Sequence, residues 1–337
     1  MYFGLKLKFM RSSIWLFFLL LLSSSCTTDF ELAAPWRDVP VVYGFLSLQD
    51  TAHYIRVEKV FLEPDGDARQ IAEIADSIYY GPEVRVFLEK INSGQRFELD
   101  RVNGSVEGYP RASGPFAEQP NILYKIRAED LNLQPGRPIR LIIDRGAQAA
   151  EVRAETVVLD EITIRESNPP SPVNMGYERN INFVFNVGEA AQLFDLRLRI
   201  HIQEQRSGIS ELITKEWGLV DDLQRSSSEG RVSVGITGEA FYRFLRDVLE
   251  PEAGLRRDLL GFDVVITAGG SEFVEVLRLQ EANAGLTSAQ DIPQYSNISE
   301  GLGIFTSRSM AIREDLQITA SSLDSLREGI YTRDLGF

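Results

Sequence analysis

The chain has 337 residues, 44% hydrophobic, 25% charged and 10% aromatic, so it is long enough for two globular domains. Its 35 basic and 49 acidic residues leave a formal charge of −14, which argues against nucleic-acid binding because phosphate contacts need a basic surface. One cysteine excludes an internal disulfide, and only two histidines disfavour a catalytic zinc site, so no metal or other cofactor is expected.

Residues 1–25 have the layout of a secretory signal peptide. Basic residues at 6, 8 and 11 precede an apolar run over 14–22, and three serines follow at 23–25. The apolar run is shorter than the roughly 20 residues that span a bilayer. We therefore expect this segment to be removed rather than to cross the membrane.

The lone Cys26 directly follows these serines. Its position resembles the lipobox of bacterial lipoproteins, although Ser23 stands where many lipoboxes carry leucine. The resemblance implies that Cys26 becomes the acylated first residue, with palmitate among its acyl chains. A plain secretory signal with an incidental cysteine is the alternative.

Cleavage before Cys26 would remove three basic residues and no acidic ones, which leaves 32 basic and 49 acidic residues and a formal charge of −17. Such a body is repelled by anionic lipid, so acyl chains rather than basic patches would hold it at a membrane. Residues 26–38 lack periodicity and are predicted to form a lipidated tether.

Residues 39–160 are predicted to form a β-domain. Ile55 and Val57 alternate with polar neighbours, and Val86 and Leu88 do the same. Turn residues at 92–94 and 133–136 separate further strand patterns. Short strands at this spacing favour a β-sandwich.

Residues 161–337 are predicted to form a second, β-rich, sandwich-like domain after the proline-rich break at 168–172. One amphipathic helix is expected near 238–249, because apolar residues recur there at helical spacing and Thr237 can cap it. Residues 262–268 and 273–279 are predicted to form a hairpin around Gly269 and Gly270.

Several segments carry a resemblance to a known family. They are residues 41–46 (VVYGFL), 133–143, 154–157 (AETV) and 297–305 (NISEGLGIF). With the lipoprotein-like start, they resemble an uncharacterised family of Bacteroidota outer-membrane lipoproteins. Its members carry a domain of unknown function and are commonly encoded next to TonB-dependent receptors.

The resemblance implies an immunoglobulin-like first domain and a lipid anchor in the outer membrane, facing the periplasm or the cell surface. It also implies a TonB-dependent receptor as a partner, and it supplies no catalytic residues. In Bacteroidota, acidic residues such as Asp29 and Glu31 shortly after the lipidated cysteine resemble a surface-export signal. An ordinary solvated linker explains them equally well.

No motif in the sequence indicates catalysis. A nucleophile elbow and a His-Glu-x-x-His motif are both absent, and Gly301-Leu302-Gly303 is interpreted as a turn or bulge. A Ser-His-Asp triad stays open because a fold gathers its members, but His53 and His201 are expected to be surface or hydrogen-bonded residues. Pairs such as Asp221-Asp222 are weak signals among 49 acidic residues. We predict that the protein is not an enzyme.

Four aromatic residues are candidate binding residues because exposed rings stack on sugars or anchor protein partners. They are Tyr79, Tyr80, Trp217 and Tyr295. Each ring, taken alone, is also explained by packing at the rim of a core.

Three tripeptides of the form Asp-Ser/Thr-apolar resemble O-glycosylation sites used in Bacteroidota. Their acceptor residues would be Thr51, Ser77 and Ser325.

The function predicted from these features is that of a lipid-anchored envelope accessory protein that partners an outer-membrane TonB-dependent receptor or transporter. Three alternatives remain: a surface glycan-binding lipoprotein, a carboxylate-dependent hydrolase, and a purely structural envelope protein.

Overall fold

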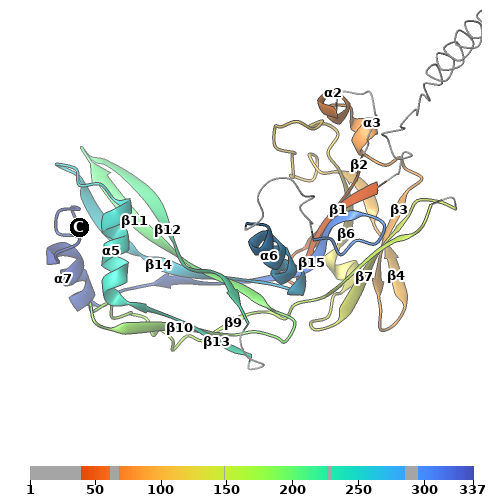
Figure 1. Cartoon of the computed structure of the whole chain (residues 1–337). Coiled ribbons are helices and arrows are strands. Elements are labelled where there is room, and N and C mark those ends of the chain that lie inside the picture. The colour runs from red at the N-terminus through yellow and green to blue at the C-terminus, as the bar shows by residue number, and fades with distance from the viewer. Residues whose placement is uncertain (1–38, 61–67, 148, 226–229, 285–294) are drawn as a thin grey trace, which may run out of the picture. The chain divides into compact units, whose positions relative to one another are not determined.

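The computed structural model describes residues 39–60, 68–147, 149–225, 230–284 and 295–337 (Figure 1). Strands hold far more of these residues than helices do, so the prediction of a mainly β protein is confirmed. The predicted signal peptide, Cys26 and the tether lie outside the described residues.

The first sandwich is built from eight strands in two hydrogen-bonded groups. They are β1 (Val39–Leu46), β2 (Ala52–Val60), β3 (Arg85–Lys90), β4 (Gln95–Glu98), β5 (Asp100–Asn103), β6 (Ile122–Arg127), β7 (Pro138–Asp144) and β8 (Val152–Val157). One group has the order β1-β2-β6-β5 and the other β4-β3-β7-β8. Lettered in chain order, with β4 as C′, these are the A-B-E-D and C′-C-F-G sheets of an immunoglobulin-like sandwich, as predicted.

Alternation along the strands decides which residues fill this first core. Ile55 and Val57 of β2 are 0% and 1% exposed, and Val86 and Leu88 of β3 are both fully buried. Burying each such side chain contributes roughly 1.5–3 kcal/mol to folding. Three short helices, α2 (Ala68–Ala72), α3 (Ala75–Ile78) and α4 (Ala128–Leu131), occur in the connections.

The second sandwich repeats this strand order. Its strands are β9 (Thr163–Ile164), β10 (Asn180–Asn186), β11 (Leu193–Arg206), β12 (Ile209–Gln224), β13 (Arg231–Thr237), β14 (Arg256–Gly269) and β15 (Leu302–Leu316). One sheet has the order β13-β10-β9, which corresponds to E-B-A. The strands β12-β11-β14-β15 correspond to C′-C-F-G and form one half of an eight-stranded sheet, whose other half is the β1-β2-β6-β5 group of the first sandwich. The sequence showed no internal repeat, because the two sandwiches share topology rather than residues.

The predicted amphipathic helix is α5 (Gly238–Val248), between β13 and β14. It places Phe241 and Leu245, both fully buried, in the second core. Thr237 adopts an extended N-cap conformation, with φ −86° and ψ 148°, but its side chain forms no capping hydrogen bond. A last helix, α7 (Ala320–Glu328), follows β15.

The prediction of a strand over 273–279 is wrong. Residues 271–284 form helix α6 (Ser271–Ala284). Both edges of β14 are already paired, with β11 on one side and β15 on the other, so the following segment has no free edge to join. A short apolar run suits helix and strand alike, and here tertiary structure decides.

Strand β15 belongs to both sandwiches. Residues 302–307 pair in parallel with β1, and residues 308–316 pair antiparallel with β14 (Figure 1). The prediction that all of residues 161–337 belong to the second domain is therefore wrong at β15. The structure instead puts Ile298 and Phe305 in the first core, while Leu159 packs into the second.

Candidate functional site

A groove lies on the face of β1 and β2 that points away from the first core. We call it the β1–β2 groove, and its volume is about 640 Å³, within the range of ligand sites. Its lining residues come from both strands, from α2 and α3, and from the loop before β6: Val41, Tyr43, Arg56, Glu58, Lys59, Val60, Ala72, Ile78, Arg111, Pro115 and Phe116.

The polar centre of the β1–β2 groove is a carboxylate shared by two arginines. Glu58 accepts hydrogen bonds from Arg56 Nη1 at 2.9 Å and from Arg111 Nη1 at 2.7 Å. The three side chains are only 24%, 12% and 14% exposed, for Arg56, Glu58 and Arg111 respectively. Partial burial strengthens such charge-assisted hydrogen bonds because water screens them less.

Arg111 is held by more than Glu58. Its Nη1 also donates to the Tyr79 hydroxyl at 2.9 Å, and its Cζ lies 4.8 Å from the centroid of the Phe116 ring. Burial tends to lower the pKa of Arg111, but the hydrogen bonds to Glu58 and Tyr79 outweigh it and raise the pKa overall. The guanidinium therefore stays charged and is fixed in position.

The groove has a positive charge surplus. Among its described lining residues, Arg56, Lys59 and Arg111 are cationic and only Glu58 is anionic. The remaining lining is largely apolar, and Lys59 Nζ lies 5.9 Å from the Tyr80 ring centroid. Such a surface suits an anionic group attached to an apolar body, in a protein whose overall charge is strongly negative.

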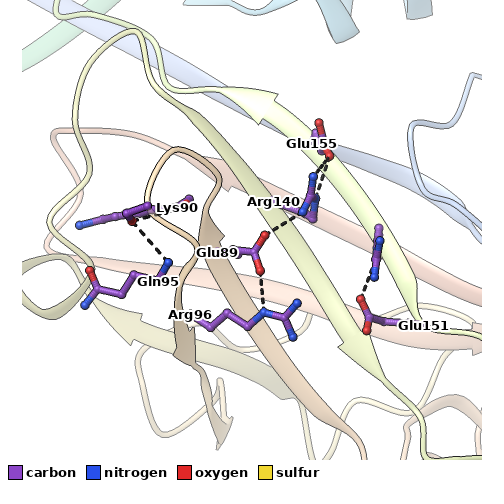
Figure 2. Close-up of polar contacts among 9 residues, drawn as sticks. Glu89, Lys90, Gln95, Arg96, Arg140, Glu151 and Glu155 are labelled. Carbon is purple, nitrogen blue, oxygen red and sulfur yellow. Dashed lines mark hydrogen bonds and ion pairs between the residues drawn. The ribbon is translucent and has the colours of Figure 1, made fainter.

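A second polar cluster crosses the other sheet of the first sandwich. Figure 2 shows Glu89 between Arg96 and Arg140, with Glu155 on the far side of Arg140. The hydrogen bond from Arg96 is the main cause that lowers the pKa of Glu89. Two cations and two anions alternate here, so the row is self-neutralised and stabilises the sheet rather than presenting free charge.

The structure does not support exposed binding rings at Tyr79 and Tyr80, which are only 4% and 7% exposed. Trp217 stacks on Phe244 of α5, with ring centroids 5.0 Å apart, and packs against the second core. Tyr295 is partly buried, and burial is the main cause that raises its pKa. The four rings thus lie in different packing environments and form no common binding surface. Each ring packs against neighbouring strands or helices instead.

The predicted glycosylation residues differ in accessibility. Thr51 is exposed directly before β2, whereas Ser77 lies in α3 and is partly buried. The Ser325 hydroxyl donates to the Ser321 carbonyl at 3.1 Å within α7. The modification stays a prediction for all three.

The two histidines are in different surroundings. His53 is 1% exposed, its Nδ1 has no hydrogen-bond partner among the residues that the structure describes, and burial lowers its pKa despite the opposing charge of Asp50. His201 lies on the polar face of β11, where Nε2 is 2.8 Å from Asp263 Oδ2 and Nδ1 is 3.2 Å from Thr214 Oγ1. The expectation of a surface or hydrogen-bonded histidine therefore holds for His201 but not for His53.

The acidic pair Asp221-Asp222 lies in β12, and the carboxylate of Asp221 is paired with an arginine. Arg197 Nη2 lies 3.1 Å from Asp221 Oδ1, and the Asp222 amide donates to Asp195. Within the described ranges, no three His, Cys, Asp or Glu side chains are placed to hold a metal ion. No helix in that part of the chain is long and apolar enough to span a bilayer.

Sequence reasoning missed the β1–β2 groove. Arg56 and Glu58 are among the polar neighbours with which Ile55 and Val57 alternate, but Arg111 lies in a loop without periodicity. No local signal indicates that a residue 53 positions away shares the carboxylate of Glu58.

No protein-family model and no curated protein matches the chain. One similar solved structure is the C-terminal globular domain of an oligosaccharyltransferase from Pyrococcus abyssi, with 11% identity over 68% of this chain and 46% of that one, and a TM-score of 0.24. Another is the FN1–FN3 domains of chicken CNTN1, with 9% identity over 81% of this chain and 66% of that one, and a TM-score of 0.16. Both likenesses are too low to carry an argument. The described fold itself defines a tandem of two immunoglobulin-like β-sandwiches with a cationic groove.

Proposed function

We propose that this protein is a lipid-anchored binding protein of the bacterial cell envelope, anchored in the outer membrane as an accessory to a TonB-dependent receptor or transporter. The anchor is proposed from Cys26 and the signal-like segment before it. The partner and the Bacteroidota family are proposed from the sequence resemblance. The structural observation that carries the binding role is the pair of arginines around one carboxylate in the β1–β2 groove.

The mechanism is binding at raised local concentration. Several acyl chains, at about 0.8 kcal/mol per buried methylene, hold the chain at the bilayer and restrict its search for partners to the membrane plane. An acidic group of the partner enters the groove and pairs with Arg56 and Lys59. The hydrogen bonds that Glu58 accepts from Arg111 and Arg56 keep these side chains in position. Apolar neighbours such as Phe116 exclude water and strengthen these contacts.

The anchor is tested by the Cys26→Ser variant in intact cells. We expect the wild type to incorporate labelled palmitate and to fractionate with outer membranes, and the variant to do neither. A variant that still fractionates with membranes, or a wild type without label, contradicts the lipid anchor.

The groove is tested by crosslinking in intact cells followed by mass spectrometry of the recovered receptor. Arg56→Gln with Lys59→Gln removes two charged contacts, and we expect recovery of the receptor to fall by about tenfold. Arg127→Gln is the matched control, because Arg127 is exposed on the same sandwich and pairs only with Glu129 among the described residues. Equal recovery from all variants, or a polysaccharide that binds instead, argues against this function.

A further inference from the structure

A second concave site lies where β3 ends and β7 begins. Its volume is about 340 Å³, and none of its lining residues belongs to the β1–β2 groove. Leu133, Ile139 and Val158 contribute its apolar floor, and Ile139 and Val158 are almost fully buried. We call it the Lys90 pocket.

The charges of the Lys90 pocket all have one sign. Lys90 and Arg137 both line it, and no carboxylate is among its lining residues. Neither cation forms an ion pair with another side chain in the described part of the chain. Lys90 Nζ instead lies 5.1 Å from the Phe97 ring centroid. Two cations without a carboxylate partner, beside an apolar floor, attract an anion.

The backbone holds the rim of this pocket in place. The Gly136 amide donates to the Val158 carbonyl at 2.9 Å, and the Val158 amide donates to the Arg137 carbonyl at 3.0 Å. On the opposite side, the Gly94 amide closes the β3–β4 turn on the Lys90 carbonyl at 2.8 Å. Because both turns are hydrogen-bonded, the pocket is preformed, and binding would cost little ordering.

We propose that the Lys90 pocket binds a small organic anion that carries one carboxylate or phosphate group on an apolar body. Lys90 and Arg137 would pair with the anionic group, and the Asn92 amide would add a hydrogen bond. Leu133, Ile139 and Val158 would cover the apolar body. The volume lies near the lower end of small-molecule sites, which favours a small ligand over a protein surface. This inference goes beyond the proposed function and does not depend on it.

The first test compares ligands on the full-length chain by fluorine NMR. The probes are para-fluorobenzoate, para-fluorophenyl phosphate and the uncharged para-fluorobenzamide, with inorganic phosphate as a competitor. We expect the charged aromatic probes to bind about tenfold more tightly than the amide, and more weakly as salt is raised. The two charged probes distinguish a carboxylate from a phosphate group. Displacement by inorganic phosphate at equal concentration would show that the apolar floor contributes nothing, which overturns the proposal.

The second test assigns the binding to this pocket. Lys90→Gln and Arg137→Gln are each expected to weaken the charged probe by about fivefold or more, and the double variant to abolish the preference over the amide. Arg153→Gln is the control, because Arg153 is an exposed cation on the same sheet that pairs with Glu151. Unfolding midpoints check that each variant is folded. An unchanged affinity in the folded double variant, or an equal loss in Arg153→Gln, refutes the site.

Discussion

At the scale of single residues, burial rather than residue type sets the chemistry. His53 and His201 both lie on β-strands, yet His53 is buried with an unpaired Nδ1 and His201 pairs with Asp263 at the surface. Likewise, Glu89 and Glu58 each accept hydrogen bonds from two arginines. The row around Glu89 is neutral overall, whereas the groove around Glu58 has more cationic than anionic side chains.

His53 makes folding stability depend on pH. Burial lowers its pKa below the ordinary value of 6.5, so the unfolded chain binds a proton more readily than the folded chain. The stability present above pH 6.5 is therefore lost as pH falls from 6.5 toward the lowered pKa. We expect His53→Gln to flatten this part of the curve of unfolding free energy against pH, measured by urea denaturation. An unchanged slope would mean that another group titrates.

Gly303 is required by the approach of β15 to β1. Its φ is +111°, and a Cβ there would lie 2.0 Å from the Val42 carbonyl oxygen. We expect Gly303→Ala to lower the free energy of unfolding by roughly 1–3 kcal/mol or more, since strain and a backbone clash add. Gly108→Ala is the control, because Gly108 has φ +89° but open space around it. Equal losses for the two variants in urea denaturation would show that contact with Val42 is not the cause.

At the scale of elements, sheet edges explain the main departures from prediction. The segment before β15 lies along the edge of β8, where the Ser299 amide donates to the Arg153 carbonyl at 2.8 Å. Asn297 joins this segment to both strands: its Nδ2 donates to the carbonyls of Phe305 and Glu155, and its Oδ1 accepts from the Phe305 amide. The segment and β15 therefore cover edges of the first sandwich that would otherwise be open to other chains.

Removing Asn297 should expose that edge. We expect Asn297→Ala to destabilise the protein by roughly 1–3 kcal/mol, because it removes three side-chain hydrogen bonds. Asn297→Asp keeps the acceptor for the Phe305 amide but places an oxygen against two carbonyl oxygens, so it should not restore the lost stability. Hydrogen exchange over 152–157 and 302–307 should speed up in the alanine variant, and unchanged exchange there would contradict this role.

At the scale of the whole molecule, β15 links two cores of the same topology. Phe305 in its first half is fully buried in the first core, and Leu316 at its end is 1% exposed in the second. A strand that contributes to both cores cannot leave one sheet without disturbing the other. The described unit should therefore unfold cooperatively.

This coupling can be measured with one core variant on each side. Phe305→Ala lies in the first core and Phe262→Ala in the second, and each should cost roughly 3–5 kcal/mol because both rings are fully buried. We expect a single calorimetric transition that both variants move to lower temperature. Two transitions, each moved by only one variant, would show that the sandwiches unfold independently.

Local periodicity was enough to predict the β-class, the strands with strict alternation and the helix α5, because burial on one face imposes that periodicity. Ile55 and Val57 could be assigned to one buried face without any partner being known. Tertiary structure alone decided that residues 271–284 are helical, that β15 joins both sandwiches and that Arg111 meets Glu58. Those outcomes depend on which sheet edges are free and which distant residues meet, and neither is encoded in the periodicity of any single segment.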